Sequence, residues 1–84
     1  NEEYNKARMM LKHFENKVDV IVTHCAPSSI QRKLAPDYPI NELTDFLEEI
    51  KNTIEYDKWY FGHYHIDCPF DEKHTAVFNN ILSI

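Results

Sequence analysis

The chain has 84 residues, which is enough for one small domain or part of one, because a chain of this size buries only about 60 to 65% of its unfolded surface. Its 14 acidic and 9 basic side chains give a formal net charge of −5, which repels polyanions and disfavours non-specific binding to nucleic acid. Two cysteines are too few for a disulfide framework, and neither a membrane-spanning apolar run nor a signal-peptide pattern is present, so we expect a soluble, cytoplasmic protein with reduced thiols.

The first predicted element is an amphipathic helix over residues 2–15. Its apolar residues recur at three- and four-residue spacing, with charged residues between them. These residues are Tyr4, Ala7, Leu11 and Phe14. A packing role accounts for this helix. The chain starts at Asn1 without a methionine, and we expect it to be a piece of a longer protein.

A strand is predicted next, at residues 18–23. Apart from Asp19, its residues are apolar on both faces, which favours a central strand of a mainly parallel sheet. Parallel strands place ligand-binding residues at their carboxyl ends, and His24 lies at that end. Residues 25–40 are rich in turn formers and predict a long loop.

A second helix is predicted after this loop. Asn41 suits the N-cap, and Glu42 places a negative charge in the first turn, where the helix dipole favours it. The apolar stripe has helical spacing. It comprises Leu43, Phe46, Leu47, Ile50 and Ile54.

A second apolar strand is predicted at residues 59–65, and it ends in two histidines. Successive side chains of a strand point to opposite faces, so His63 and His65 should project the same way, about 7 Å apart. Gly62, the only glycine, would let the backbone turn sharply or approach a ligand. Strand, loop, helix and strand make a βαβ unit with parallel strands, so His24 should converge with this pair at one edge of the sheet.

Three imidazoles at one edge suit a divalent transition metal, because neutral imidazole binds zinc, manganese, iron or nickel. The candidate metal ligands are therefore His24, His63 and His65. His13 lies in the amphipathic helix and His74 in a charged turn, and we expect both to be solvated.

The remaining residues, 66–84, predict a β-hairpin around a polar turn at residues 71–74, with a further strand at residues 81–84. The predicted fold class is therefore α/β, in the order helix, strand, loop, helix, strand and hairpin.

Two blocks of this chain resemble one known family. Gly62-His63-Tyr64-His65 matches the Gly-His-x-His block of the calcineurin-like metallophosphoesterases, and Val20-Ile21-Val22-Thr23-His24 resembles the block that precedes it. The resemblance covers residues 18–78 and only the carboxyl-terminal half of the family's domain, since the Asp-x-His, Gly-Asp and Gly-Asn-His blocks are absent. It implies that residues 1–84 are the carboxyl-terminal half of a metallophosphoesterase-type α/β sandwich, whose amino-terminal half is missing here.

The resemblance also implies a site and an activity. His24 and His63 would bind the second of two divalent ions (Mn, Fe, Zn or Ni), and His65 would bind the first. Such a pair, about 3.5 to 4 Å apart, activates a water for attack on a phosphate ester. The substrate would be a phosphoprotein, a nucleotide or a small phosphomonoester. Carboxylates, an asparagine and the general acid would come from the missing half, so this chain alone should be an inactive part of a phosphatase-type hydrolase.

Three alternatives remain open on the residues alone. A mononuclear three-histidine zinc site could activate one water. Cys25 could be a nucleophile with a histidine base, although neighbouring side chains in a strand diverge and His24 would then point away from it. The chain could also be a non-catalytic interaction module on the same scaffold.

Overall fold

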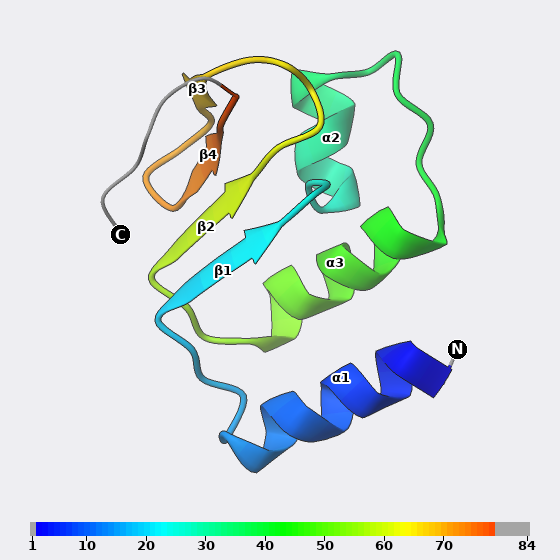
Figure 1. Cartoon of the computed structure of the whole chain (residues 1–84), viewed down its shortest axis with the longest axis vertical. Coiled ribbons are helices and arrows are strands. Elements are labelled where there is room, and N and C mark those ends of the chain that lie inside the picture. The colour runs from blue at the N-terminus through cyan, green and yellow to red at the C-terminus, as the bar shows by residue number, and fades with distance from the viewer. Residues whose placement is uncertain (1, 79–84) are drawn as a thin grey trace.

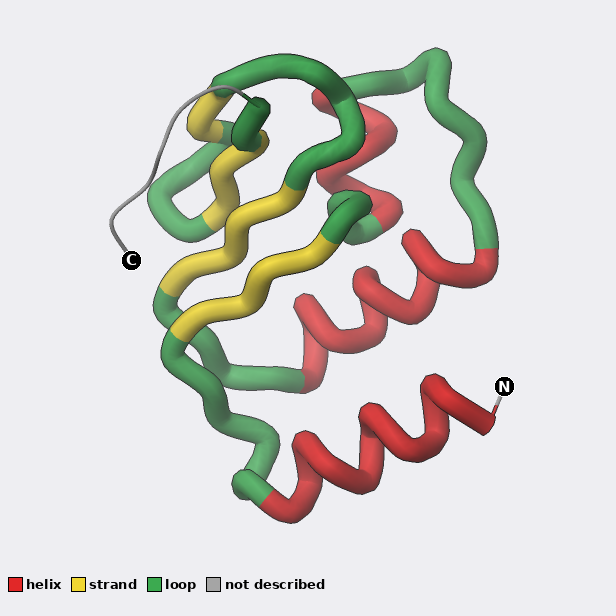
Figure 2. The backbone as a smooth tube through the Cα atoms, viewed as in Figure 1, coloured by secondary structure: helices red, strands yellow, loops and turns green. Residues whose placement is uncertain are grey.

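A mixed β-sheet flanked by helices makes up residues 2–78, the part of the chain that this computed structural model describes (Figure 1). The helices are α1 (Glu2–His13), α2 (Ser28–Leu34) and α3 (Glu42–Thr53), and the strands are β1 (Val20–Thr23), β2 (Lys58–Phe61), β3 (Cys68–Pro69) and β4 (His74–Ala76). The helices all lie to one side of β1 and β2 (Figure 2). Helices and strands thus combine in a small α/β arrangement, as the sequence predicts. None of the helices in residues 2–78 has the length and apolar character needed to cross a bilayer.

The sheet has the strand order β1-β2-β4-β3. β1 pairs with β2, and β2 with β4, in parallel, whereas β3 and β4 form an antiparallel hairpin. Two parallel strands joined through a helix were expected, and this prediction is confirmed. The predicted hairpin is also confirmed, while the strand predicted at residues 81–84 falls outside the described residues.

β1 lies at an edge of the described sheet, so the prediction of a central strand is wrong. On the helix-covered face, Trp59 and Phe61 of the neighbouring β2 have no exposed surface. On the opposite face, Val22 of β1 is 65% exposed. Helices α2 and α3 cover one face of the sheet (Figure 1), so apolar residues on both faces of β1 do not lead to burial on both.

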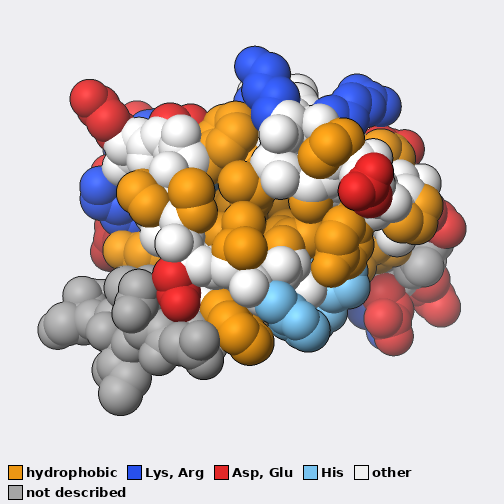
Figure 3. Space-filling view, turned by 90° about the horizontal axis from the view of Figure 1, so that it is seen from above, with side chains coloured by type: hydrophobic (Ala, Val, Ile, Leu, Met, Phe, Trp, Pro, Cys, Tyr) orange, Lys and Arg blue, Asp and Glu red, His pale blue; other side chains and the backbone are white. Residues whose placement is uncertain are grey.

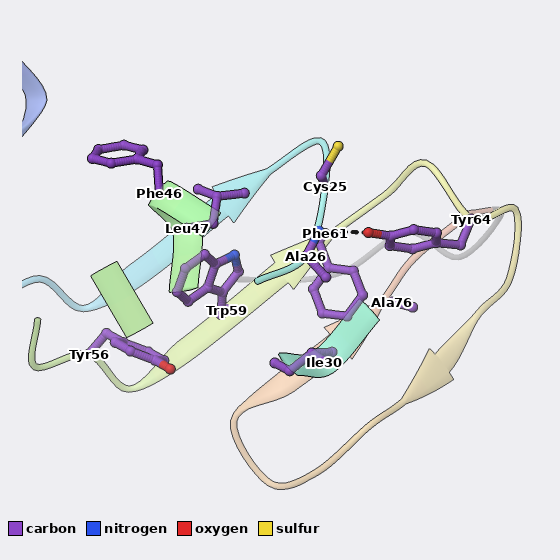
Figure 4. Packing of buried hydrophobic residues seen from close by; sticks show 10 residues of the cluster. All are labelled: Cys25, Ala26, Ile30, Phe46, Leu47, Tyr56, Trp59, Phe61, Tyr64 and Ala76. Atoms are coloured by element: carbon purple, nitrogen blue, oxygen red, sulfur yellow. Dashed lines mark hydrogen bonds between the residues drawn. The ribbon is translucent and has the colours of Figure 1, made fainter. Parts of the chain in front are cut away.

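The core fills the space between the covered face of the sheet and helices α2 and α3 (Figure 4). Its buried side chains are Cys25, Ala26, Ile30, Phe46, Leu47, Tyr56, Trp59, Phe61, Tyr64 and Ala76. Helix α1 packs on the outside of α3 and has no buried residue. Tyr4 of α1 stacks on Phe46 with 4.4 Å between ring centroids, and Arg8 pairs with Glu49 at the surface.

Local sequence signals set the ends of two helices. The Asn41 side chain accepts a hydrogen bond from the Thr44 N–H at 2.9 Å, and the Thr44 hydroxyl accepts one from the Asn41 N–H at 3.0 Å. This capping box confirms Asn41 as the N-cap of α3. Helix α1 ends at His13, earlier than predicted, because Glu15 and Asn16 take left-handed φ angles of 60° and 57°.

Helix α2 lies inside the segment predicted as a long loop, so that prediction is wrong in part. Its seven residues carry only a short apolar pattern, but Ile30 and Gln31 are almost completely buried. The Gln31 amide donates hydrogen bonds to the carbonyls of Tyr38 and Pro39, which ties the following turn to the helix. Tertiary contacts that sequence periodicity does not reveal thus stabilise this helix.

His74 is buried, with 4% of its surface exposed, so the prediction of a solvated side chain is wrong. Its Nδ1 lies 2.8 Å from Asp71 Oδ1, and its Nε2 lies 2.5 Å from the Tyr56 hydroxyl. Burial, together with the charges of Asp71 and Glu48, raises the pKa of Tyr56 to about 12. The protonated phenol therefore donates to Nε2, and Nδ1–H donates to Asp71. Both ring nitrogens of His74 are used within the fold.

We predict that Phe61→Ala lowers the free energy of unfolding by about 3 to 5 kcal/mol, because it removes a fully buried ring from the core. Phe14→Ala is the matched control, since Phe14 is 57% exposed and should cost less than about 1 kcal/mol. Urea unfolding followed by circular dichroism measures both. Equal losses in the two variants would contradict this core.

A second prediction concerns the acid stability of the chain. Partial burial acts to raise the pKa of Asp71, but hydrogen bonds from the His74 ring and from the N–H groups of Lys73 and His74 outweigh it and hold that pKa below its ordinary value. A carboxylate with a lowered folded-state pKa stabilises the fold above its unfolded pKa of about 3.9, and this contribution disappears as the pH falls through the folded pKa.

Asp71→Asn should therefore reduce stability at pH 6 and flatten the decline in stability below about pH 4. Urea midpoints measured at pH 6 and pH 3 test this expectation. Asp37→Asn, at an exposed position before Tyr38, is the control and should leave the pH dependence unchanged. An identical pH dependence in Asp71→Asn and the unaltered chain would show that the contact does not contribute.

Candidate metal centre

His24 and His63 meet at the carboxyl ends of β1 and β2. The two strands are parallel neighbours, and Thr23 pairs with Phe61 in the register, so the chain leaves both strands at the same edge. The two imidazole centroids lie 4.6 Å apart, with 57° between the ring planes. The structure thus brings together two of the three candidate ligands, and their binding of a metal stays a prediction.

Cys25 completes a group of three potential ligands with these histidines. One ligand atom from each of His24, Cys25 and His63 lies within 4.8 Å of the others. The expected divergence of His24 and Cys25 is wrong, because β1 ends at Thr23 and both residues lie in the bend that follows. In that bend the Thr23 hydroxyl donates to the Cys25 carbonyl at 2.6 Å, and it accepts a bond from the Trp59 indole N–H at 2.9 Å.

His65 is not part of this group in the described portion of the chain. β2 ends at Phe61, and His63 and His65 have φ angles of 78° and 58°, so the prediction that both project from one extended strand is wrong. The exposed His65 ring instead stacks on Phe78, with 4.9 Å between centroids and 22° between planes. Its assignment as a ligand of the first ion stays a prediction.

The sharp turn after β2 is made by the histidines and not by Gly62. Gly62 has no positive φ, and a Cβ at this position would meet the carbonyl oxygens of His24 and Val77 only at 3.9 Å, which is an ordinary contact. The conformational freedom expected of this glycine is therefore not used.

Tyr64 joins the two segments that carry the group. Its hydroxyl accepts a hydrogen bond from the Ala26 N–H at 3.0 Å and donates a short one to the Gln31 side-chain oxygen. Burial raises the pKa of the Tyr64 phenol, which keeps it protonated and able to donate. Tyr38 contacts the edges of both His63 and Tyr64, with centroids 5.0 and 5.1 Å away.

The three potential ligands differ in exposure. His24 is exposed, His63 is half-buried and Cys25 is buried, and burial raises the pKa of the Cys25 thiol. Histidine side chains lie side by side at this end of the molecule, next to hydrophobic side chains (Figure 3). Imidazole nitrogen and thiolate sulfur are both common ligands of zinc.

Sequence reasoning missed two contributions to this site. It applied strand alternation to His24 and Cys25, although the predicted strand ends at Thr23, and it gave no role to Tyr64 or Tyr38. The signal for Tyr64 was its large aromatic side chain between the two histidines, which favours a buried position. In the structure Tyr64 is only 6% exposed. The contact of Tyr38 with His63 depends on how the segment after α2 folds back, and no local pattern reports it.

Comparison with protein families, with curated proteins and with solved structures finds no match.

We predict that Tyr64→Phe lowers the affinity of the site for Zn²⁺ by about 10-fold or more, because contacts of this kind orient metal-binding segments. It should also cost about 1 to 3 kcal/mol of stability, since the fully buried Ala26 N–H loses its acceptor. Calorimetric titration and urea unfolding measure the two effects. Tyr60→Phe is the control, because Tyr60 lies between Trp59 and Phe61 in β2 and its side chain is on the other face of the sheet. Unchanged Zn²⁺ affinity in Tyr64→Phe would rule out this positioning role.

Proposed function

We propose that the chain supplies the imidazole part of a dinuclear metal centre that hydrolyses phosphate esters. The observation that supports this function is the convergence of His24 and His63 at the carboxyl ends of two parallel, paired strands. It is the geometry expected from the resemblance of the two histidine blocks to calcineurin-like metallophosphoesterases. In this proposal His24 and His63 hold the second ion and His65 holds the first.

The donor atoms fit a divalent transition metal. Within residues 2–78 no hydrogen bond uses a ring nitrogen of His24 or His63, so these nitrogens are available to a ligand. His74 is the opposite case, since both of its nitrogens already have partners. Neutral imidazole is a suitable donor for Mn, Fe, Zn or Ni.

The charge of the site indicates what else the centre needs. Two dications held only by neutral imidazoles would repel each other strongly, and the group of described ligands contains no carboxylate. The proposal therefore assigns the bridging carboxylate, the asparagine and the general acid to an amino-terminal half of the same domain. In this cytoplasmic hydrolase the 84-residue chain is inactive by itself.

The residues of this chain have two tasks in such a centre. When bound, the metal pair supplies an activated water and polarises the phosphoryl group. His24 and His63 fix the position of one ion, and the hydrogen bonds of Tyr64 keep their two segments at a constant separation. The exposed side of His24 leaves room for a phosphorylated substrate. In this proposal the substrate is a phosphoprotein, a nucleotide or a small phosphomonoester, and loops of both halves of the domain select among them.

Two alternative functions make different demands on the same residues. A mononuclear three-histidine zinc site requires His65 in the ligand group, where the described residues have Cys25. If the chain is a non-catalytic module, the intact protein should have no phosphatase activity. Metal content and turnover distinguish all three functions.

The intact protein should contain two metal ions per chain and hydrolyse p-nitrophenyl phosphate. We predict that His63→Ala lowers kcat/KM by about 100-fold or more, which is about 2.7 kcal/mol of transition-state stabilisation, without unfolding the protein. His13→Ala, at the exposed end of α1, is the control and should retain full activity. One ion per chain would favour the mononuclear site, and near-normal activity in His63→Ala would overturn the proposal.

A further inference from the structure

Cys25 is a potential metal ligand that the proposed phosphatase chemistry does not use. We infer that His24, Cys25 and His63 together bind one thiophilic divalent cation such as Zn²⁺, with Cys25 Sγ as the third ligand. The inference rests on the proposed function in one respect, namely that His24 and His63 bind the same ion. It requires neither phosphate chemistry nor residues outside this chain.

The backbone around Cys25 is held in place before any ion binds. The Cys25 carbonyl accepts a hydrogen bond from the Thr23 hydroxyl, and the N–H of the next residue, Ala26, donates to the Tyr64 hydroxyl. Cys25 is thereby fixed on both sides, between the end of β1 and the segment that carries His63. Binding an ion at this position needs little reorganisation of the main chain.

The distances are compatible with a single tetrahedral ion. Zinc binds sulfur at about 2.3 Å and imidazole nitrogen at about 2.0 to 2.1 Å, which places ligand atoms about 3.3 to 3.6 Å from one another. The three ligand atoms here lie within 4.8 Å of one another. Small side-chain rotations close the difference, and a fourth position stays open for water or another ligand.

The chemistry of the donors decides which ions bind. On coordination the Cys25 thiol gives its proton to water, and the sulfur forms a bond to the metal as a thiolate. Its negative charge offsets part of the charge of the dication, which the two imidazoles cannot do. A thiolate with two imidazoles prefers Zn²⁺ or Co²⁺ to Mg²⁺ or Ca²⁺, which prefer oxygen ligands.

Cys68 provides a matched control within the same chain. It is also a free cysteine, but it lies in β3, it is half-buried, and it belongs to no ligand group in residues 2–78. Its Sγ lies 3.6 Å from the Pro69 carbonyl oxygen. A serine at either position keeps a side chain of similar size and removes the sulfur, so the two variants differ in the proposed ligand.

Co²⁺ titration of the 84-residue chain tests the inference, because a cobalt–thiolate bond gives a charge-transfer absorption in the near ultraviolet. We expect this band in the unaltered chain and in Cys68→Ser, and its loss in Cys25→Ser and His63→Ala. Zn²⁺ should displace Co²⁺, whereas Mg²⁺ should not. The affinity for Zn²⁺ should fall by about 100-fold in Cys25→Ser. Circular dichroism of each variant checks that it remains folded.

Several results would overturn the inference. They are the absence of Co²⁺ binding, Co²⁺ binding without the charge-transfer band, and a band of equal strength in Cys25→Ser. The proposed function fails separately, when the intact protein with His63→Ala retains phosphatase activity. A normal phosphatase without the cobalt–thiolate band would leave the proposed function standing and remove Cys25 from the site.

Discussion

The parallel pairing of β1 with β2 is the constraint on which the rest of the structure depends. It aligns Thr23 with Phe61, so the next residues of both strands emerge at one edge of the sheet. The same pairing places the fully buried Trp59 under the helices, where its indole donates to the Thr23 hydroxyl that holds the following bend. Core packing and the arrangement of the metal-binding candidates are therefore consequences of one register.

Patterns within short segments predicted much of the fold. The apolar stripe and the N-cap gave α3, two apolar runs gave the paired strands, and the polar turn gave the β3–β4 hairpin. The position of β1 at the edge of the described sheet could not be obtained in this way, since the apolar pattern of a strand does not specify which strands pair with it. Helix α2 was missed for a related reason, because Ile30 and Gln31 gain their burial from contacts distant in sequence.

The candidate site was predicted to a similar extent. The convergence of His24 and His63 follows from parallel strands, but the role of each histidine depends on long-range partners. His74 looked solvated in a charged segment, yet Tyr56 and Asp71 occupy both of its ring nitrogens. The side chain of Cys25 was expected to point away from His24, because strand alternation was extended past Thr23, where the strand has already ended. In each case the error came from applying a local rule beyond the element to which it belongs.

The left-handed backbone of His63 and His65 has a consequence for variants at these two positions. Such φ angles cost a residue with a Cβ about 1 to 2 kcal/mol relative to glycine. Replacing either histidine with glycine would therefore relax the main chain while it removes an imidazole. At His63, resistance to unfolding and the proposed capacity to hold an ion would then change in opposite directions, which is the trade-off expected when a strained residue carries a function.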